Sequence, residues 1–290
     1  MSRRIAALGL VLGCAGCASG RAHEGTGTVR IVTTMSTLAS LASSVGGDRV
    51  TVANLVPIGA SPEDYQPTPR DVERLHDADV LIENGGGLET WLDGTIASAG
   101  NPDLAVVIAT GGMKLVGGNP HLWMDPVFAR AYVEKIRAAL AKRDPAGAPA
   151  YEANARAFDA KLDALTRRIA QTIARIPSAR RKMLVFHDAW AYYDARFGLR
   201  TVGVIETSPG REPSPASLAA IVARARREHV HAAFTEPEYS PKLVDAIARS
   251  AGITTIAQLY DDSLGGDAHT GNYIAMLEYD TRTIAAALQK

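Results

Sequence analysis

The chain has 290 residues, in which 31 lysine and arginine residues balance 31 aspartate and glutamate residues. This neutrality argues against a nucleic-acid partner and against broad electrostatic steering of charged ligands. The length is sufficient for two domains. After the first twenty residues no stretch approaches the length of apolar sequence that spans a bilayer, so we expect no membrane-spanning helix there.

The first twenty residues have the pattern of an export signal. Arg3 and Arg4 give a positively charged start, residues 5–12 are apolar, and small residues surround Cys14 and Cys17. The Gly-Cys pairs indicate a lipoprotein cleavage box. Cys17 is the preferred lipidated residue and Cys14 is its competitor, while a simply cleaved signal peptide is a further option. A single lipid would tether the protein to a membrane surface without making it a membrane protein.

Both cysteines of the chain fall in this leader. The mature protein therefore has no disulfide and no thiolate ligand, and any metal site in it must use nitrogen and oxygen atoms. We assign residues 1–20 to the signal or lipoprotein segment and residues 21–27 to a tether.

Short apolar runs rich in β-branched residues alternate with helical patterns after this tether. The runs predict strands at residues 29–33, 50–55, 80–82 and 105–108. Helices are predicted between them at residues 38–45 and 69–75. Such alternation is typical of βαβ units and a mostly parallel sheet.

The middle of the chain is helical from Pro126 onward, with an interruption at Pro145, Gly147 and Pro149. A long helix is predicted over residues 151–176, because its apolar positions fall on one stripe, at Phe158, Leu162, Leu165, Ile169 and Ile173. Pro177 ends this helix.

A second alternating series follows. It predicts strands at residues 183–186, 201–205, 232–235 and 253–259, and helices at residues 189–197, 215–228, 241–251 and 273–288. The expected fold is therefore α/β, with two Rossmann-like lobes that have central, mostly parallel sheets and are joined by one long rigid helix. We place the N-terminal lobe at residues 28–145, the linking helix at 146–177 and the C-terminal lobe at 178–290.

Ligands of open α/β sheets bind in the crevice outside the carboxyl ends of the strands. Polar residues follow four of the predicted strands, two in each lobe, in the segments 57–69, 119–126, 187–190 and 260–263. A site between the lobes could therefore be lined from both sides.

Four residues in these segments are candidate ligands: Glu63, His121, His187 and Asp262. Each has an ordinary structural interpretation when it is taken alone. The histidines could be hydrogen-bonded structural residues, Asp262 could cap a turn, and Glu63 could be a solvated loop charge. Their combination is what favours a metal site.

Several segments, in order along the chain, carry a resemblance to a known family. They read NGGGLETWL from Asn84, NPHLWMDP from Asn119, FHDAWAYY from Phe186, ETSPGREPSPASL from Glu206, FTEPEYSPKL from Phe234, and DDS from Asp261. With these segments the sequence resembles, over essentially the whole mature chain, the ZnuA/TroA-like zinc and manganese receptors of ABC importers. The resemblance implies that two lobes hold one divalent ion at their interface, and that His121, His187 and Asp262 are three of its ligands.

The first ligand position departs from the family pattern. The family loop usually reads Gly-Ala-Asp-Pro-His-x-Tyr-x-Pro-x-Pro, and Glu63 stands here at the histidine position. We expect Glu63 to replace the histidine as an oxygen ligand. Two alternatives stay open: Asp64 could swing in, or the site could use water or another carboxylate.

The metal's identity depends on this position. Two imidazoles and two carboxylates would suit Mn²⁺ or Fe²⁺, whereas three histidines and one carboxylate would favour tetrahedral Zn²⁺. The short segment 111–118 lacks a histidine-rich loop, which weakens the case for zinc. The Irving–Williams order still favours Zn²⁺ over Mn²⁺ at nitrogen and oxygen sites, so the cargo is Zn²⁺ or Mn²⁺, with Fe²⁺ as a further option.

Ligating histidines usually donate their second ring N–H to a carboxylate or carbonyl. Glu236 and Asp125 are the candidates for this supporting role, and we expect Asp188 to cap the helix after His187. The rings of Trp123, Trp190 and Tyr65 could form an apolar wall around the site or could be ordinary core.

The resemblance implies a monomeric receptor in the periplasm or on the outer face of the cytoplasmic membrane. Such a receptor delivers its ion to the membrane permease of an ABC importer. A surface adhesin or a metallochaperone on the same scaffold is the alternative, and a relative that had lost metal binding is a weaker one. A metallohydrolase is disfavoured, because the sequence has neither a paired-histidine zinc signature nor a Gly-x-Ser-x-Gly elbow.

Overall fold

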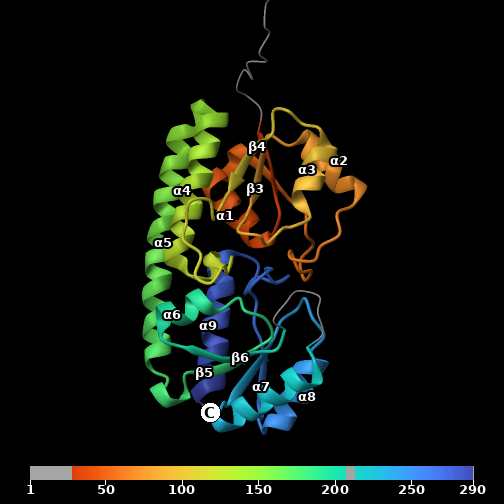
Figure 1. Cartoon of the computed structure of the whole chain (residues 1–290). Helices are drawn as coiled ribbons and strands as arrows, with labels where there is room; N and C mark the ends of the chain where they lie inside the picture. Colours follow the sequence, from red (N-terminus) through yellow and green to blue (C-terminus); the bar gives the residue numbers. More distant parts are fainter. Residues whose placement is uncertain (1–27, 207–212, 290) are drawn as a thin grey trace, which may run out of the picture.

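The computed structural model describes residues 28–206 and 213–289. The leader with Cys14 and Cys17 lies outside the described residues, so its assignment stays a prediction. Two four-stranded parallel sheets form the framework, with strand orders β2-β1-β3-β4 and β6-β5-β7-β8. This arrangement confirms the α/β prediction of two lobes (Figure 1).

The first lobe contains the first sheet and four helices. Its strands are β1 (Val29–Thr33), β2 (Val50–Asn54), β3 (Val80–Glu83) and β4 (Ala105–Ile108). Its helices are α1 (Ser36–Gly46), α2 (Pro69–Asp77), α3 (Leu92–Ala99) and α4 (Pro126–Arg143). The strands match the predictions to within one residue at each end. The pattern did not predict α3, because this short helix contains Gly94 and is stabilised by packing against α2 and the sheet.

Side-chain alternation along the strands places a core on each face of the first sheet. Ile31 and Ile82 pack with α1 and α4 on one face, whereas Val32 and Leu81 pack with α2 and α3 on the other. Both faces are covered, as parallel sheets require. The two helix layers lie on opposite sides of the sheet (Figure 1).

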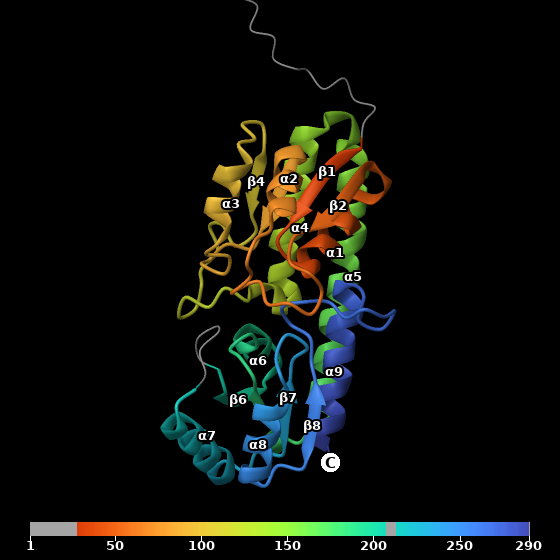
Figure 2. The same ribbon diagram turned by 90° about the vertical axis from the view of Figure 1, so that its right-hand side faces the viewer.

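The second lobe repeats this plan. Its strands are β5 (Lys182–Val185), β6 (Arg200–Val204), β7 (Ala232–Thr235) and β8 (Thr255–Gln258). Its helices are α6 (Ala191–Phe197), α7 (Pro215–Arg227), α8 (Lys242–Ala251) and α9 (Tyr273–Gln289). Helices α7 and α8 cover one face of the sheet, and α6 and α9 lie on the other (Figure 2).

The long helix α5 (Ala148–Ala174) runs along both lobes (Figure 1). It has 27 residues and is therefore about 40 Å long. Its predicted apolar stripe is buried throughout. Pro149, which we expected to interrupt the helical pattern, instead lies in the first turn of α5, where its missing N–H costs no hydrogen bond.

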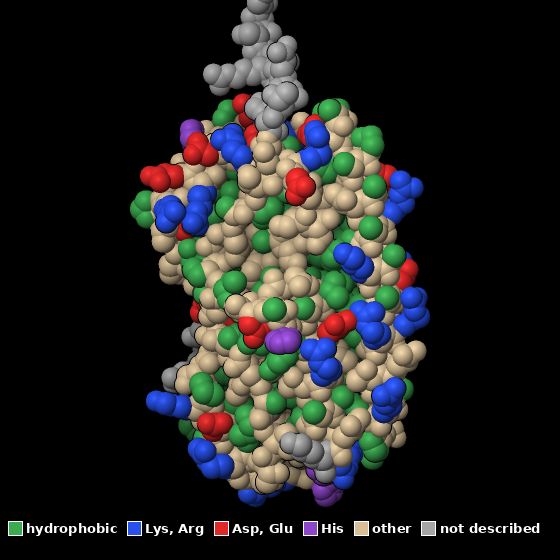
Figure 3. Space-filling model, turned by 180° about the vertical axis from the view of Figure 1, so that it is seen from behind, with side chains coloured by type: hydrophobic (Ala, Val, Ile, Leu, Met, Phe, Trp, Pro, Cys, Tyr) green, Lys and Arg blue, Asp and Glu red, His purple; other side chains and the backbone are tan. Residues whose placement is uncertain are grey.

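The described residues also contain short 3-10 helices, at Gly47–Arg49, Leu122–Met124, Pro145–Gly147 and Ser178–Arg180. Among the described residues, no helix combines the length and apolarity needed to cross a membrane. On the rear face, acidic and basic side chains are interspersed, without a field of one sign (Figure 3). This distribution agrees with the balanced charge of the sequence.

Candidate metal centre

The four candidate ligands follow strand ends in both lobes. Glu63 lies in the loop after β2 and His121 in the loop after β4, while His187 follows β5 and Asp262 follows β8. In each sheet the strands are parallel, so their carboxyl ends share one edge. The two edges face each other, since His121 and His187 meet between them. The two histidines and Asp262 are buried, and Glu63 retains 13% of its side-chain exposure.

Three of these side chains form a compact group. The Nε2 atoms of His121 and His187 are 3.3 Å apart. Oδ1 of Asp262 lies 3.5 Å from the first nitrogen and 3.6 Å from the second. All three ligand atoms fall within 4.8 Å of one another, which is compatible with a shared cation.

Glu63 borders this group. Its Oε1 is 3.7 Å from Nε2 of His121. Asp64 is exposed to solvent and is not part of the group of buried side chains, so the geometry does not favour the alternative in which Asp64 replaces Glu63.

The carboxylate of Asp262 has an unusual environment. The residue is 1% exposed, and neither of its oxygen atoms has a hydrogen-bond partner among the described residues. A buried carboxylate without donors is costly unless a positive charge compensates it. In the absence of metal this charge is the imidazolium of His187. Burial alone would raise the pKa of Asp262, but the positive charge on His187 holds that pKa well below its ordinary value.

The neighbours of Asp262 have raised pKa values. Burial lowers the pKa of His187, but the carboxylates of Glu236, Asp261 and Asp262 outweigh it and raise the pKa well above the ordinary value. Burial, followed by the charge on Asp262, raises the pKa of Glu63 to about 7. The metal-free centre therefore holds protons that a cation would displace.

Each histidine is oriented by a hydrogen bond at its other ring nitrogen. Nδ1 of His187 lies 2.6 Å from Oε2 of Glu236, as we expected for this glutamate. Nδ1 of His121 lies 3.0 Å from Oδ1 of Asn119. Both Nε2 atoms consequently face the centre, where the loss of any proton on Nε2 leaves a lone pair for a cation.

The structure does not place Asp125 in the supporting role that we expected. Its Oδ1 accepts a hydrogen bond of 2.9 Å from the backbone of Val127 at the start of α4, and its Oδ2 accepts one of 2.8 Å from Arg196. The residue precedes Pro126 and is therefore the N-cap of α4. The residue that bonds Nδ1 of His121 is Asn119, which we did not predict from the sequence. Its position two residues before the histidine was the available signal.

The expected capping role of Asp188 is also wrong. Helix α6 begins at Ala191 with Trp190 in the capping position, so Asp188 lies too early in the chain to cap it, and its side chain is exposed. The chain bends at His187, and the helix starts only at Ala191. The sequence pattern does not reveal this bend between the strand and the helix.

The rings around the centre have different roles. Trp123 is fully buried, and its ring lies 4.9 Å from that of His121. Trp190 is also fully buried and donates to Asp261, 3.2 Å away. Tyr65 instead hydrogen-bonds Asp71 and packs on Trp91, away from the histidines.

Tyr239, for which we predicted no role, lines the centre beside His187. Its ring stacks on Phe186 at 4.3 Å between centroids and lies 6.1 Å from that of His187.

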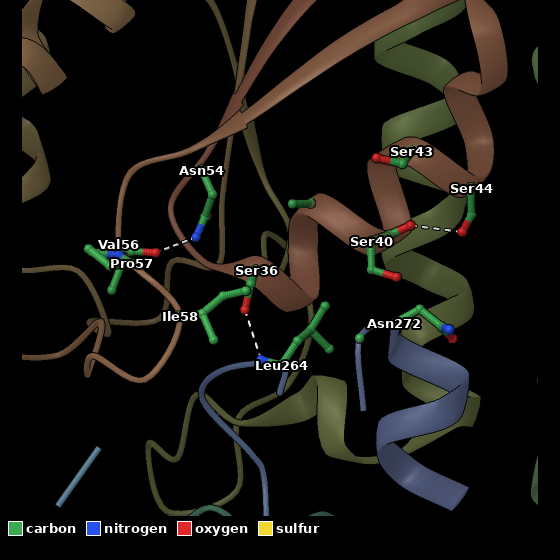
Figure 4. Close-up of a pocket in the computed structure, with 12 residues that line it drawn as sticks. Ser36, Ser40, Ser43, Ser44, Asn54, Val56, Pro57, Ile58, Leu264 and Asn272 are labelled. Carbon is green, nitrogen blue, oxygen red and sulfur yellow. Dashed lines mark hydrogen bonds between the residues drawn. The ribbon is translucent and has the colours of Figure 1, made fainter. Parts of the chain in front are cut away.

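A separate hollow of about 560 Å³ lies between α1, the loop after β2, and the segment that leads from Asp262 to α9 (Figure 4). Ser36, Ile58 and Asn272 contribute to its lining, and none of the candidate ligands does. The hydroxyl of Ser36 accepts a hydrogen bond of 2.8 Å from the backbone of Leu264 across the lobes. This hollow is therefore a gap between the lobes and not part of the metal centre.

Comparisons with known proteins identify the family. The model of the ZnuA family, described as zinc-uptake complex component A, periplasmic, matches residues 31–287. The manganese-binding lipoprotein MntA of Halalkalibacterium halodurans is 30% identical over 286 residues, which cover 97% of this chain and 95% of that protein. The iron-binding protein YfeA of Yersinia pestis is 29% identical over 266 residues, with coverages of 88% and 85%.

Solved structures share the fold. The periplasmic zinc-binding protein TroA of Treponema pallidum superposes with a TM-score of 0.82 at 26% identity and covers 91% of this chain and all of its own. The manganese-bound periplasmic metal-binding protein of Candidatus Liberibacter asiaticus has a TM-score of 0.79 at 24% identity, with coverages of 90% and 99%. The family match spans both lobes and all four candidate ligands, so the chain belongs to the ZnuA family of periplasmic zinc-uptake complex components.

Proposed function

We propose that this protein is an extracytoplasmic receptor that captures one divalent transition-metal ion between its lobes. It then delivers the ion to the membrane permease of an ABC importer. The observation that carries the proposal is the pair of facing Nε2 atoms beside the buried carboxylate of Asp262, whose Oδ1 lies 3.5 and 3.6 Å from them. The relatives named for manganese and iron binding support the same class of cargo.

The proposed ligands are His121, His187, Asp262 and Glu63. The first three form the compact group, and Glu63 completes the set with a small movement of its side chain toward His121. Two carboxylates neutralise a divalent ion and can bind through both oxygens, which expands the coordination beyond four. This set favours Mn²⁺ or Fe²⁺ over tetrahedral Zn²⁺.

The proposed organisation assigns residues 28–145 and 178–290 to the two lobes and residues 146–177 to the linking helix. Helix α5 packs on α1 and α4 of the first lobe and on α9 of the second, so it restricts how far the lobes can separate. We further propose that the leader is processed, and that a lipid on Cys17 or Cys14 tethers a monomer to the outer face of the membrane. The names of relatives as lipoproteins support this anchoring.

Metal analysis of the purified mature protein tests the proposal. We expect one ion per chain, and competitive titrations with Mn²⁺ and Zn²⁺ should give a dissociation constant for each. The substitutions His121→Ala and His187→Ala should each weaken binding severely, while circular dichroism shows an intact fold. A protein that binds neither ion stoichiometrically would overturn the proposal.

A further inference from the structure

Asn119 connects the two lobes beside the metal centre. It lies in the first lobe, in the loop between β4 and His121. Its Oδ1 accepts hydrogen bonds from the backbone N and from Nδ1 of His121, at 2.9 and 3.0 Å. Its Nδ2 donates to the carbonyl oxygen of Asp188 in the second lobe, at 2.6 Å. One side chain therefore bonds a candidate ligand in one lobe and the backbone of the other.

The hydrogen-bond chemistry fixes the orientation of this amide. The backbone N–H of His121 can only donate, and the carbonyl of Asp188 can only accept. The oxygen of Asn119 must therefore face the histidine, and its nitrogen must face the second lobe. With the amide oxygen in this position, Nδ1 of the neutral imidazole carries the proton, and Nε2 keeps its lone pair for a cation.

The bond to the second lobe reaches the other histidine. Asp188 follows His187 directly in the chain, so the Asn119 side chain is attached to the backbone that positions this second ring. The arrangement differs from that of Glu236, which orients His187 from within the same lobe. Asn119 thus bonds a ligand ring and also spans the cleft.

Tyr192 on α6 ties the same loop to the second lobe. Its hydroxyl donates to the carbonyl oxygen of Asn119 at 2.7 Å and accepts a hydrogen bond of 2.9 Å from the backbone of Val116. The backbone of Asn119 is therefore held where its side chain can reach both partners.

We propose that Asn119 is a positioning residue that clamps the two lobes across the bound ion and sets the rate at which the ion is released. The inference rests on the proposed metal-receptor function. Opening the cleft breaks the bond to Asp188, and the bonds to His121 keep the ring aligned while the cleft is closed. The clamp therefore slows dissociation more than it speeds association.

Two substitutions separate the roles of the amide. Asn119→Asp retains an oxygen acceptor for His121 but loses the donor to Asp188, whereas Asn119→Ala loses both. Ser40→Ala is the matched control, because Ser40 accepts a hydrogen bond of 3.0 Å from the backbone of Tyr273 across the lobes and touches no candidate ligand.

Stopped-flow mixing of the Mn²⁺-loaded mature protein with excess chelator measures the rate of ion release. A separate stopped-flow experiment measures the rate of Mn²⁺ association. We expect Asn119→Asp to accelerate release about tenfold, the effect of one ordinary hydrogen bond, with little change in association. Asn119→Ala should accelerate release further, and Ser40→Ala should stay within about threefold of the wild type. A wild-type release rate in Asn119→Asp would overturn the clamp.

Nitrogen NMR of the His121 ring in alkaline buffer provides a readout that general destabilisation does not move. In metal-free protein we expect the wild type and Asn119→Asp to carry the ring proton on Nδ1, and Asn119→Ala to lose this preference. An unchanged tautomer in Asn119→Ala would contradict the positioning role. Failure of the wild type to bind Mn²⁺ or Zn²⁺ would instead reject the metal-receptor function, and with it the role of Asn119 in ion release. The NMR measurement would still test whether Asn119 orients the His121 ring.

Discussion

The Nε2 atoms of His121 and His187 lie 3.3 Å apart, although 66 positions separate the residues in the chain and they belong to different lobes. Each ring has its Nδ1 occupied by a hydrogen bond, to Asn119 in one case and to Glu236 in the other. The two remaining nitrogens therefore face each other across the cleft. This relationship is the geometric basis of the cation site that we propose between the lobes.

Glu63→His should move metal preference toward zinc. The substitution restores a third imidazole, and a set of three histidines with one carboxylate suits tetrahedral Zn²⁺. We expect the ratio of Zn²⁺ to Mn²⁺ affinity to rise at least tenfold, measured by competition against a common chelating indicator.

The neighbouring Asp64 provides the control for this experiment. It is exposed, so Asp64→His should leave the preference between the two metals within about threefold of the wild type. An unchanged preference in Glu63→His would place Glu63 outside the coordination sphere.

Glu236→Gln should weaken metal binding by about 10- to 100-fold, the usual effect of removing a partner of a ligating histidine. The buried carboxylate bonds Nδ1 of His187 at 2.6 Å, which would keep the lone pair on Nε2 directed at a bound ion. Titration calorimetry checks the affinity, and the thermal midpoint of the metal-free protein checks that the fold is retained.

Asp125→Asn is a suitable comparison, because Asp125 caps α4 and pairs with Arg196 without bonding either histidine. We expect this variant to lose stability while its metal affinity changes by less than about threefold. Equal losses of affinity in the two variants would argue against a specific role for Glu236.

Metal affinity should rise with pH through the neutral range. In the metal-free protein, burial and the charge of Asp262 raise the pKa of Glu63 to about 7. Burial lowers the pKa of His187, but the surrounding carboxylates outweigh it and raise the pKa well above its ordinary value. A cation requires these groups without protons, so it must displace bound protons at low pH, and this cost disappears as the pH exceeds both pKa values.

Calorimetry in buffers of different ionisation enthalpy measures the protons released per ion. We expect net release at neutral pH and a smaller number in Glu63→Gln, which has no proton to lose at that position. An affinity for Mn²⁺ that does not vary with pH would contradict the shifted pKa values.

Leu162→Ala should destabilise the protein by about 2–5 kcal/mol, because it leaves a cavity beneath the long helix. Leu162 is fully buried in the stripe of α5. The exposed neighbour Lys161 is the control, since Lys161→Ala should change the free energy of unfolding by no more than about 0.5 kcal/mol. Denaturant unfolding followed by circular dichroism measures both variants.

Much of the fold was predictable because local patterns determine it. The strands of both sheets were recognised as short β-branched runs, and α5 as an apolar stripe. Helix α3 was missed, because its eight residues include Gly94 and carry little amphipathic signal. Its stability comes from contacts with α2 and the sheet, which no local pattern encodes.

The site was predictable in part for the same reason. His187 and Asp262 follow recognisable strands, and His121 lies in a distinctive segment, so the sequence placed all three near the carboxyl ends of parallel strands. The supporting partners were harder to assign. Asp125 and Asp188 have side chains suited to the roles that we expected, but the chain turns so that Asn119 bonds His121 and Asp188 contributes only its carbonyl oxygen.

The sequence by itself determined that this is a two-lobed α/β protein with histidines and carboxylates at its strand ends, because hydrophobic periodicity and residue type are local properties. It also showed that Glu63 stands where the family has a histidine. Only the tertiary structure decided that the two Nε2 atoms face each other, that Asp262 is buried beside them, and that Asn119 spans the cleft. These features depend on how the two sheets dock along α5. Hydrogen bonds across such an interface join residues far apart in the chain, so local sequence patterns do not reveal them.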